Sequence, residues 1–187
     1  SALLFAPGNY DVDVPIGYYT QVCGLGKSPS EVILKRGPRV NNGSTNFQIG
    51  ALDNFWRSCE NMTVNPPPVP NNGNALLWAV SQATSLRSVI VNGDIIMGEM
   101  EGNEMGYASG GYMANVKVNG VIDNGSQQQF LCRNTEMQEY RNPNWNAVLV
   151  GCSAVKSPTL KGHYLTQIAR TPKVAEKPYL VGTGPKD

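Results

Sequence analysis

The fold is decided by the stretch from Ala51 to Val91, which reads ALDNFWRSCENMTVNPPPVPNNGNALLWAVSQATSLRSVIV. It contains two short apolar runs of the same kind, Met62–Val64 and Val89–Val91, and each follows a polar lead-in that carries an arginine. Runs this short and this rich in β-branched residues are typical of strands rather than helices. We therefore predict two equivalent strands.

A third run of this kind, Ala114–Val118, makes the pattern periodic. Val64, Val91 and Val118 follow one another at steps of 27 residues. A fixed step of this size is the signature of a solenoid, in which each repeat buries its apolar face only against its neighbours. The other apolar runs are also short and are separated by Gly, Pro and Asn, so the sequence predicts an all-β, single-stranded parallel β-helix.

In a β-helix, like residues of successive coils lie one above another, and asparagines form ladders or occupy the turns. We expect Asn61, Asn92 and Asn134 to do this. The expected boundaries are 1–158 for the β-helix domain and 159–187 for an extended C-terminal connecting segment. Because an open-ended coil stack exposes backbone at both ends, we expect a second β-helix segment or another copy of the chain as a partner.

Composition excludes several classes of partner. The net charge is +1 over 187 residues, and only 16% of the residues are charged. This balance offers no electrostatic basis for binding nucleic acid or an anionic membrane. No apolar run is long enough to span a bilayer, so we expect no membrane partner. The chain opens at Ser1 without a starting Met, which we interpret as a cleaved form or a fragment of a secreted protein.

Three sites match the pattern for N-glycosylation, at Asn42, Asn61 and Asn124. A glycoprotein is one interpretation. The alternative is that these are ordinary turn or ladder asparagines, and this alternative is strongest for Asn61, which leads into a predicted buried strand.

The chain has four cysteines, Cys23, Cys59, Cys132 and Cys152, and no CxxC motif, so we expect no structural metal. Cys132 and Cys152 are 20 residues apart and can lie on adjacent coils. A disulfide between them is one expectation. Four small thiols buried in the core are the other.

Seven motifs recur in the same order in a known family. They are Phe5–Tyr10, Gly17–Thr20 with Gly24–Gly26, Asp53–Ser58, Trp78–Ala83, Tyr107–Gly111, Gly125–Gln129 and Glu176–Leu180. The chain resembles secreted bacterial and fungal proteins with pectate-lyase-like, right-handed parallel β-helices. Their architecture is similar to that of glycoside hydrolase family 55, the exo-β-1,3-glucanases, which have two β-helices in tandem. The resemblance covers nearly the whole chain, which looks like most of the first β-helix.

The resemblance implies part of a secreted carbohydrate-active protein that acts on or binds a β-glucan-like polysaccharide, with no cofactor. In family 55 the cleft lies between the two β-helices, and the proposed catalytic acid belongs to the second. It therefore implies a glycoside hydrolase whose catalytic half lies outside this chain, and no catalytic residue can be carried over. The alternative is a non-catalytic extracellular β-helix that binds glycans or assembles end to end.

Hydrolysis of a glycosidic bond needs two carboxyl groups facing one cleft. Glu99, Glu101 and Glu104 cluster in one loop and are the candidates, with a solvated acidic loop as the alternative. Tyr107 and Tyr112 flank a Ser-Gly-Gly turn beside this loop and are the expected substrate-binding residues.

Two tryptophans, Trp56 and Trp78, could also contact a sugar. We expect both of them in the core instead, because burying an indole ring removes a large apolar area from water.

Overall fold

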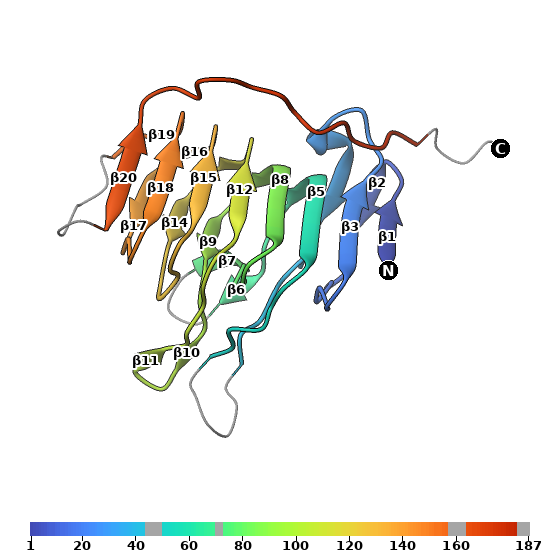
Figure 1. Ribbon diagram of the computed structural model, residues 1–187. Helices are drawn as coiled ribbons and strands as arrows, with labels where there is room; N and C mark the ends of the chain where they lie inside the picture. The colour runs from blue at the N-terminus through green and yellow to red at the C-terminus, as the bar shows by residue number, and fades with distance from the viewer. Residues whose placement is uncertain (44–49, 70–72, 157–163, 183–187) are drawn as a thin grey trace.

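The computed structural model describes residues 1–43, 50–69, 73–156 and 164–182. Successive coils wind as a right-handed parallel β-helix with three faces, as the sequence predicts (Figure 1). One sheet has 13 strands and bends to form the first and second faces, and a sheet of five strands forms the third face. Within the described ranges, no helix has the length and apolarity that a membrane span requires.

The first face contains, in spatial order, β1 (Ala2–Phe5), β3 (Thr20–Gly24), β5 (Arg57–Val64), β8 (Thr84–Val91), β12 (Tyr112–Ala114), β15 (Leu131–Arg133), β18 (Ala147–Val150) and β20 (Leu165–Ile168). The second face contains the later halves of β5 and β8 together with β2 (Gly8–Tyr10), β4 (Val32–Leu34), β13 (Lys117–Val118), β16 (Glu136–Met137) and β19 (Ser153–Ala154). A 3-10 turn, η1 (Pro29–Glu31), precedes β4.

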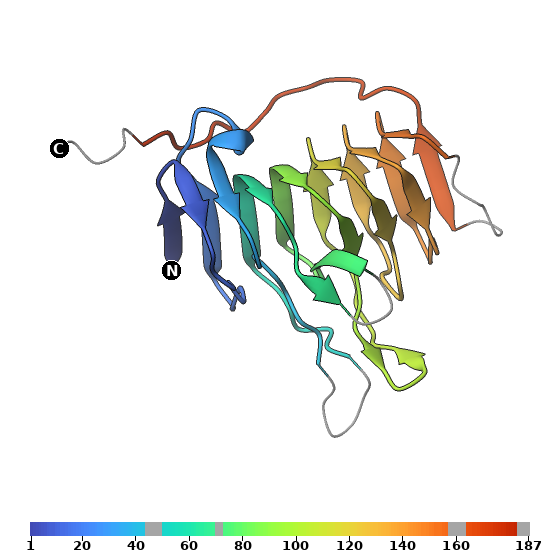
Figure 2. The ribbon, with the colours of Figure 1, turned by 180° about the vertical axis from the view of Figure 1, so that it is seen from behind.

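The third face, seen from behind in Figure 2, contains β6 (Pro68–Val69), β7 (Gly73–Leu77), β9 (Asp94–Ile96), β14 (Val121–Asp123) and β17 (Glu139–Arg141). A two-stranded hairpin of β10 (Met100–Glu101) and β11 (Glu104–Met105) projects from the stack below this face.

The register confirms the periodic valines. Val64 pairs with Val91, and Val91 pairs with Val118, in parallel neighbouring strands. The step of 27 residues holds only for these coils. Lys117 pairs with Glu136, and Glu136 pairs with Ser153, so the later steps are 19 and 17 residues. Only the strand residues must stay in register, so the loops between faces can differ in length.

Each face contributes a vertical file of apolar side chains to the core. On the first face the file consists of Val22, Cys59, Leu86, Met113, Cys132 and Leu149, all of them buried. Burying a Val, Leu or Met side chain of this file contributes about 1.5–3 kcal/mol. Because every file joins neighbouring coils, the stack forms one continuous core.

The corner between the first and second faces is built from left-handed backbone. Asn61, Ser88, Asn115 and Asn134 occupy equivalent places there with φ values of 59°, 51°, 54° and 48°. Asparagine adopts this conformation more readily than most residues. Asn61 and Asn134 are thus turn asparagines, as expected.

A separate asparagine ladder runs along the far end of the second face. Asn92 Nδ2 donates to Asn65 Oδ1 at 2.6 Å, and Asn119 Nδ2 donates to Asn92 Oδ1 at 2.7 Å. The expectation of a ladder or turn role for Asn92 is therefore confirmed. Its two ladder partners were not anticipated.

The described part of the connecting segment begins with a strand. Residues Leu165–Ile168 form β20, which pairs in register with β18, so the coil stack continues past the expected boundary at residue 158. From Thr171 to Gly182 the chain then runs back along the carboxyl ends of the first-face strands (Figure 1). We call residues 171–182 the strap. Residues 159–163 and 183–187 of the expected segment lie outside the described residues.

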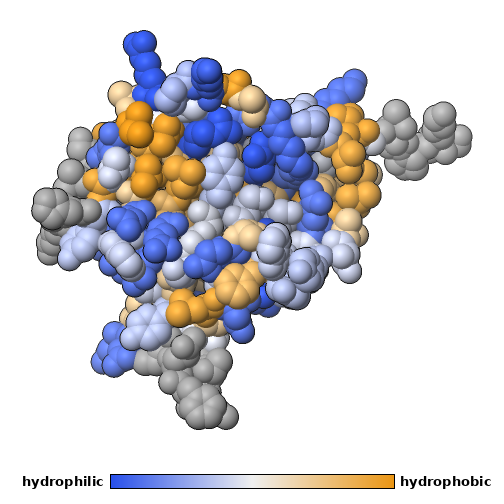
Figure 3. All heavy atoms as spheres, viewed as in Figure 1, coloured by the Kyte–Doolittle hydropathy of each residue, from blue (hydrophilic) through white to orange (hydrophobic). Residues whose placement is uncertain are grey.

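Apolar side chains gather on the surface at both ends of the coil stack. In Figure 3 they lie over β1 at one end and over β18 and β20 at the other. Leu3 and Leu4 of β1 and Ile168 of β20 are all exposed.

Candidate functional site

A groove lies where the chain enters the first face. Its cavity volume is about 470 Å³, and eight residues line it: Gln82, Ala83, Thr84, Ser85, Gly110, Gly111, Tyr112 and Gln129. They come from three successive coils, because Ser85 pairs with Tyr112 and Tyr112 pairs with Leu131. We call this the corner groove.

Two glycines form the floor of the corner groove, and their lack of a side chain leaves the groove open. Gly111 has a φ of +110°, and a Cβ atom there would lie 2.7 Å from Val80 Cγ2 and 2.8 Å from Phe130 Cε2. Gly110 has a φ of +88°, and a Cβ atom there would lie 2.7 Å from Gln82 Cγ. No larger residue fits at either position without displacing the core or the groove wall.

The groove wall carries uncharged polar groups. Within the described part of the chain, the side chains of Gln82, Ser85 and Gln129 make no hydrogen bond to other residues, so their amide and hydroxyl groups are available to a ligand. Amides and hydroxyls both donate and accept hydrogen bonds, as sugar hydroxyls do. The groove therefore suits a neutral polyhydroxylated ligand.

Tyr112, a residue of the groove wall, is fixed in position by a hydrogen bond from Arg133. Arg133 Nε donates to Tyr112 Oη at 2.9 Å, and Arg133 Nη1 lies 2.7 Å from Glu176 Oε1 of the strap. The hydrogen bond that Arg133 donates to Glu176, followed by the one it donates to Tyr112, raises the pKa of Arg133, and Arg133 in turn holds the pKa of Glu176 below its ordinary value. The Tyr112 ring is thus positioned through an ion pair with the strap.

The three candidate carboxylates do not converge on this groove. Glu99 accepts hydrogen bonds from Asn41 Nδ2 at 2.7 Å and from the Asn42 backbone N–H at 2.6 Å, so both of its oxygens serve to hold the loop. Glu104 is exposed on the hairpin, and the backbone of Glu101 pairs opposite it. The hairpin matches the alternative of a solvated acidic loop.

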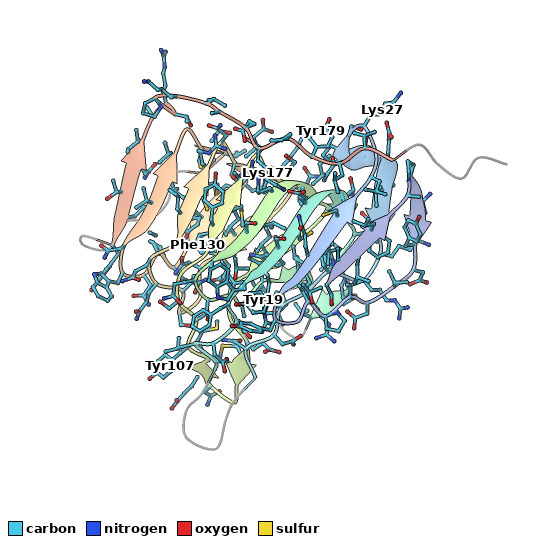
Figure 4. The ribbon with its side chains drawn as sticks, turned by 45° about the vertical axis from the view of Figure 1, so that its right-hand side comes forward. Tyr19, Lys27, Tyr107, Phe130, Lys177 and Tyr179 are labelled. Atoms are coloured by element: carbon cyan, nitrogen blue, oxygen red, sulfur yellow. The ribbon has the colours of Figure 1, made fainter. Side chains whose placement is uncertain are left out.

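Of the two expected substrate-binding tyrosines, only Tyr112 lines the corner groove. Tyr107 is exposed near the base of the hairpin, where its backbone forms a bridge with Gly50 (Figure 4). The two tyrosines are close in sequence, but they belong to different corners of the coil.

Two other cavities offer no carboxyl pair among their described lining residues. The larger has a volume of about 510 Å³, and its one carboxylate, Glu139, forms an ion pair with Arg141 at 2.9 Å. The other has a volume of about 260 Å³ beside the proline-rich loop, and its one carboxylate is the bound Glu99. Among the described residues, no three His, Cys, Asp or Glu side chains are placed to hold a metal ion.

The structure places the three asparagines of the predicted glycosylation sites in its interior rather than on its surface. Asn42 Nδ2 donates to Tyr107 O, Asn61 Nδ2 donates to Gly24 O and Gly26 O, and Asn124 Nδ2 donates to Gln127 O. All three side chains are buried. A glycan on any of these nitrogens would break those bonds and enter the coil, so the three asparagines are turn and loop elements.

The cysteines are free thiols, and no disulfide joins Cys132 to Cys152 in this structure. Cys23, Cys59 and Cys132 are buried in the coil interior. Burial raises the pKa of Cys59 and Cys132 well above the ordinary value and that of Cys23 to about 11. The arrangement corresponds to the alternative of buried core thiols.

Sequence reasoning missed most of the groove residues, although a signal for them was present. Ala83 and Gly110 are one 27-residue step apart, and so are Ser85 and Tyr112. Extending the step from the valines to these positions places them side by side.

Comparison with known proteins identifies the relatives of this chain. A family model described as rhamnogalacturonase A/epimerase, pectate lyase-like, matches residues 1–159. An exo-beta-1,3-glucanase of Streptomyces sp. (strain SirexAA-E / ActE) is 35% identical over 180 residues. That match spans 96% of this chain but only 28% of the glucanase.

Solved structures agree with the sequence match. The structure of sacteLam55A from Streptomyces sp. SirexAA-E superposes with a TM-score of 0.84 at 35% identity, covering 98% of this chain and 32% of that one. A variant of the same protein in complex with glucose superposes with a TM-score of 0.83. The architecture expected from the resemblance to glycoside hydrolase family 55 is confirmed, and the chain belongs to the rhamnogalacturonase A/epimerase, pectate-lyase-like family.

Proposed function

We propose that this chain is the polysaccharide-binding part of a β-glucan-active glycoside hydrolase and that it holds the glucan in the corner groove. The observation that supports this is the 35% identity to an exo-beta-1,3-glucanase across almost the whole chain. The uncharged amide and hydroxyl groups of the groove are consistent with a neutral glucan.

The groove supports binding rather than bond cleavage. Glycoside hydrolysis uses two carboxyl groups on either side of the scissile bond, roughly 5–10 Å apart. The lining of the corner groove has none. We therefore propose that a second β-helix, docked against this one, supplies the acid and the base. Because the proposed substrate is an extracellular polymer, we also propose that the protein is secreted.

One observation favours a different role. Exposed leucines on β1 lie at an edge of the sheet that is open in the described chain. Such an edge can pair with another chain. On this reading the chain is a non-catalytic extracellular β-helix that binds glycans or assembles end to end, without a catalytic partner.

A substitution that fills the groove tests the first proposal. Ser85→Arg places a long side chain in the groove without entering the core. Thr166→Arg is the matched control, because Thr166 lies in the same file of the first face, on β20, outside the groove. Mobility in native gels containing laminarin, a soluble β-1,3-glucan, measures binding.

We expect laminarin to retard the wild type and Thr166→Arg but not Ser85→Arg. Equal retardation of all three proteins would show that the corner groove is not the binding site. We also expect the chain alone to release no reducing sugar from laminarin, so release of sugar would show that a catalytic pair lies within it. A rise in molecular mass with concentration and no retardation by laminarin would favour end-to-end assembly.

A further inference from the structure

Each coil enters the first face through a corner residue whose backbone is left-handed. These residues form a row, and the corner groove lies on this row. Six coils place a residue with positive φ at this corner, and the row consists of Tyr19, Trp56, Ala83, Gly110, Gln129 and Asn146. Their φ values lie between 53° and 88°. The winding of the coil, rather than any one side chain, therefore imposes this conformation.

Two members of the row are poorly suited to that backbone. Left-handed backbone is commonest in glycine and asparagine and is a genuine outlier for a bulky residue. Gly110 and Asn146 satisfy the preference, whereas Tyr19 and Trp56 do not. A strained residue that persists points to a use beyond the fold.

The fold does not use these rings as core. Tyr19 is 60% exposed and Trp56 is 52% exposed. The rings stack on each other with centroids 5.9 Å apart and planes inclined by 25°, and Tyr18 packs against Tyr19 with centroids 4.3 Å apart. The three rings form an aromatic cluster on the surface at the start of β3 and β5.

The cluster borders the corner groove on one side. The next member of the row after Trp56 is Ala83, and the one after that is Gly110, and both line the groove. Neighbouring coils are roughly 4.8 Å apart. Tyr19 stacks on Trp56, and Ala83, the next member of the row, carries only a methyl group, so no large side chain of the row stands between Trp56 and the groove floor.

We propose that Trp56, supported by Tyr19 and Tyr18, is a stacking platform for a glucopyranose ring and extends the glucan site beyond the corner groove. A β-linked pyranose presents its axial C–H bonds on its two faces, so it packs flat on an aromatic ring while its hydroxyls point outward to amides. This inference rests on the proposed function. It adds a second contact zone and sets the direction of the bound chain along the row, from the platform to Gln129.

The test replaces each ring by the residue that the backbone prefers. Trp56→Asn and Tyr19→Asn keep the left-handed conformation and remove the platform. Tyr179→Asn is the matched control, because Tyr179 is an exposed tyrosine on the strap, at the opposite end of β3 from Tyr19 (Figure 4). Trp56→Phe keeps an aromatic face. Binding is measured by laminarin gel retardation, and folding is measured by thermal melting.

We expect Trp56→Asn to weaken laminarin binding about tenfold, which corresponds to the loss of one stacked contact. Tyr19→Asn weakens it less, and Trp56→Phe and Tyr179→Asn stay near the wild type. Wild-type binding by a folded Trp56→Asn variant overturns the platform while leaving the proposed function intact. If Trp56→Asn fails to fold, two other measurements decide. The platform is overturned when Tyr19→Asn binds laminarin as the wild type does and the tryptophan fluorescence of the wild type does not change in saturating laminarin. No retardation of the wild type overturns both.

Discussion

At the scale of single residues, the chain uses polar side chains to hold loops rather than to present them to solvent. Glu99 illustrates this. Its carboxylate binds Asn41 and Asn42, and its own backbone N–H donates to Asn42 Oδ1 at 2.9 Å. An acidic residue in a glycine-rich loop suggested catalysis, but its position is fixed by three hydrogen bonds that tie the hairpin to the coil.

Removing that carboxylate is expected to weaken the fold. Glu99→Ala leaves the partly buried donors of Asn41 and Asn42 without acceptors, at a cost of about 1–3 kcal/mol. Glu104→Ala is the control, since Glu104 is exposed on the same hairpin. Urea unfolding measures both variants. Similar stability of the two variants would show that the Glu99 bonds contribute little.

Trp56 and Trp78 are the same residue type, but one is exposed and the other is buried. Trp78 is fully buried, as expected, whereas the expectation that Trp56 lies in the core is wrong. Trp78 follows a strand of the third face, where its side chain is directed inward. Trp56 occupies a left-handed corner that directs its side chain outward. Composition and hydrophobicity cannot distinguish the two.

At the scale of elements, the strap closes the corner between the first and second faces. Glu176 lies between Arg87 and Arg133, and Lys177 Nζ lies 2.5 Å from Glu60 Oε2. Farther along, Tyr179 Oη donates to Lys27 O at 2.8 Å. The strap therefore pairs charges that the outer side of the first face would otherwise leave without partners.

These ion pairs give the strap a dependence on pH. Arg133 is the main cause that lowers the pKa of Glu176 below its ordinary value of 4.5. A carboxyl group whose pKa is lowered in the folded state stabilises that state above its unfolded pKa, and the contribution disappears as the pH falls through the folded pKa. The stabilisation by Glu176 is thus complete above pH 4.5 and decreases below it.

We expect Glu176→Gln to lower the stability by about 1 kcal/mol at neutral pH, a modest value because the carboxylate is partly exposed. The difference in melting temperature between Glu176→Gln and the wild type should shrink as the pH is lowered below 4.5. Lys173→Gln serves as the control, since Lys173 is exposed on the same segment. A difference that is constant with pH would show that Glu176 acts through packing alone.

At the scale of the whole molecule, the interior is one uninterrupted column of apolar files. Cys23, Cys59 and Cys132 are buried within it. Burial raises the pKa of each thiol, to about 11 for Cys23, so almost no thiolate is present at pH 8 and exposure requires unfolding. Thiol reactivity therefore reports on the whole column.

We expect Ellman's reagent to react with these three thiols only under conditions that unfold the chain. In denaturant without reductant, alkylation should add four labels, one for each cysteine. Two labels, with Cys132 and Cys152 unmodified, would establish the disulfide instead. Fast reaction of the native protein at Cys59 or Cys132 would contradict the burial.

The sequence by itself determined the coil architecture, because the information is local and repeated. Short β-branched runs, turn formers between them and the equal spacing of Val64, Val91 and Val118 together require stacked parallel strands. The same local reasoning correctly assigned turn roles to Asn61 and Asn134, since asparagine tolerates the left-handed backbone that a sharp corner needs.

Only the tertiary structure decided which side chains meet at a corner and which way they point. The step between paired residues is 37 from Val22 to Cys59, 27 from Cys59 to Leu86, and 19 from Met113 to Cys132. Because loops of unequal length separate the strands, sequence distance does not give distance along the column. Parallel hydrogen bonding sets the register instead, and this register brings Trp56, Ala83 and Gly110 into one row while it keeps Tyr107 away from Tyr112.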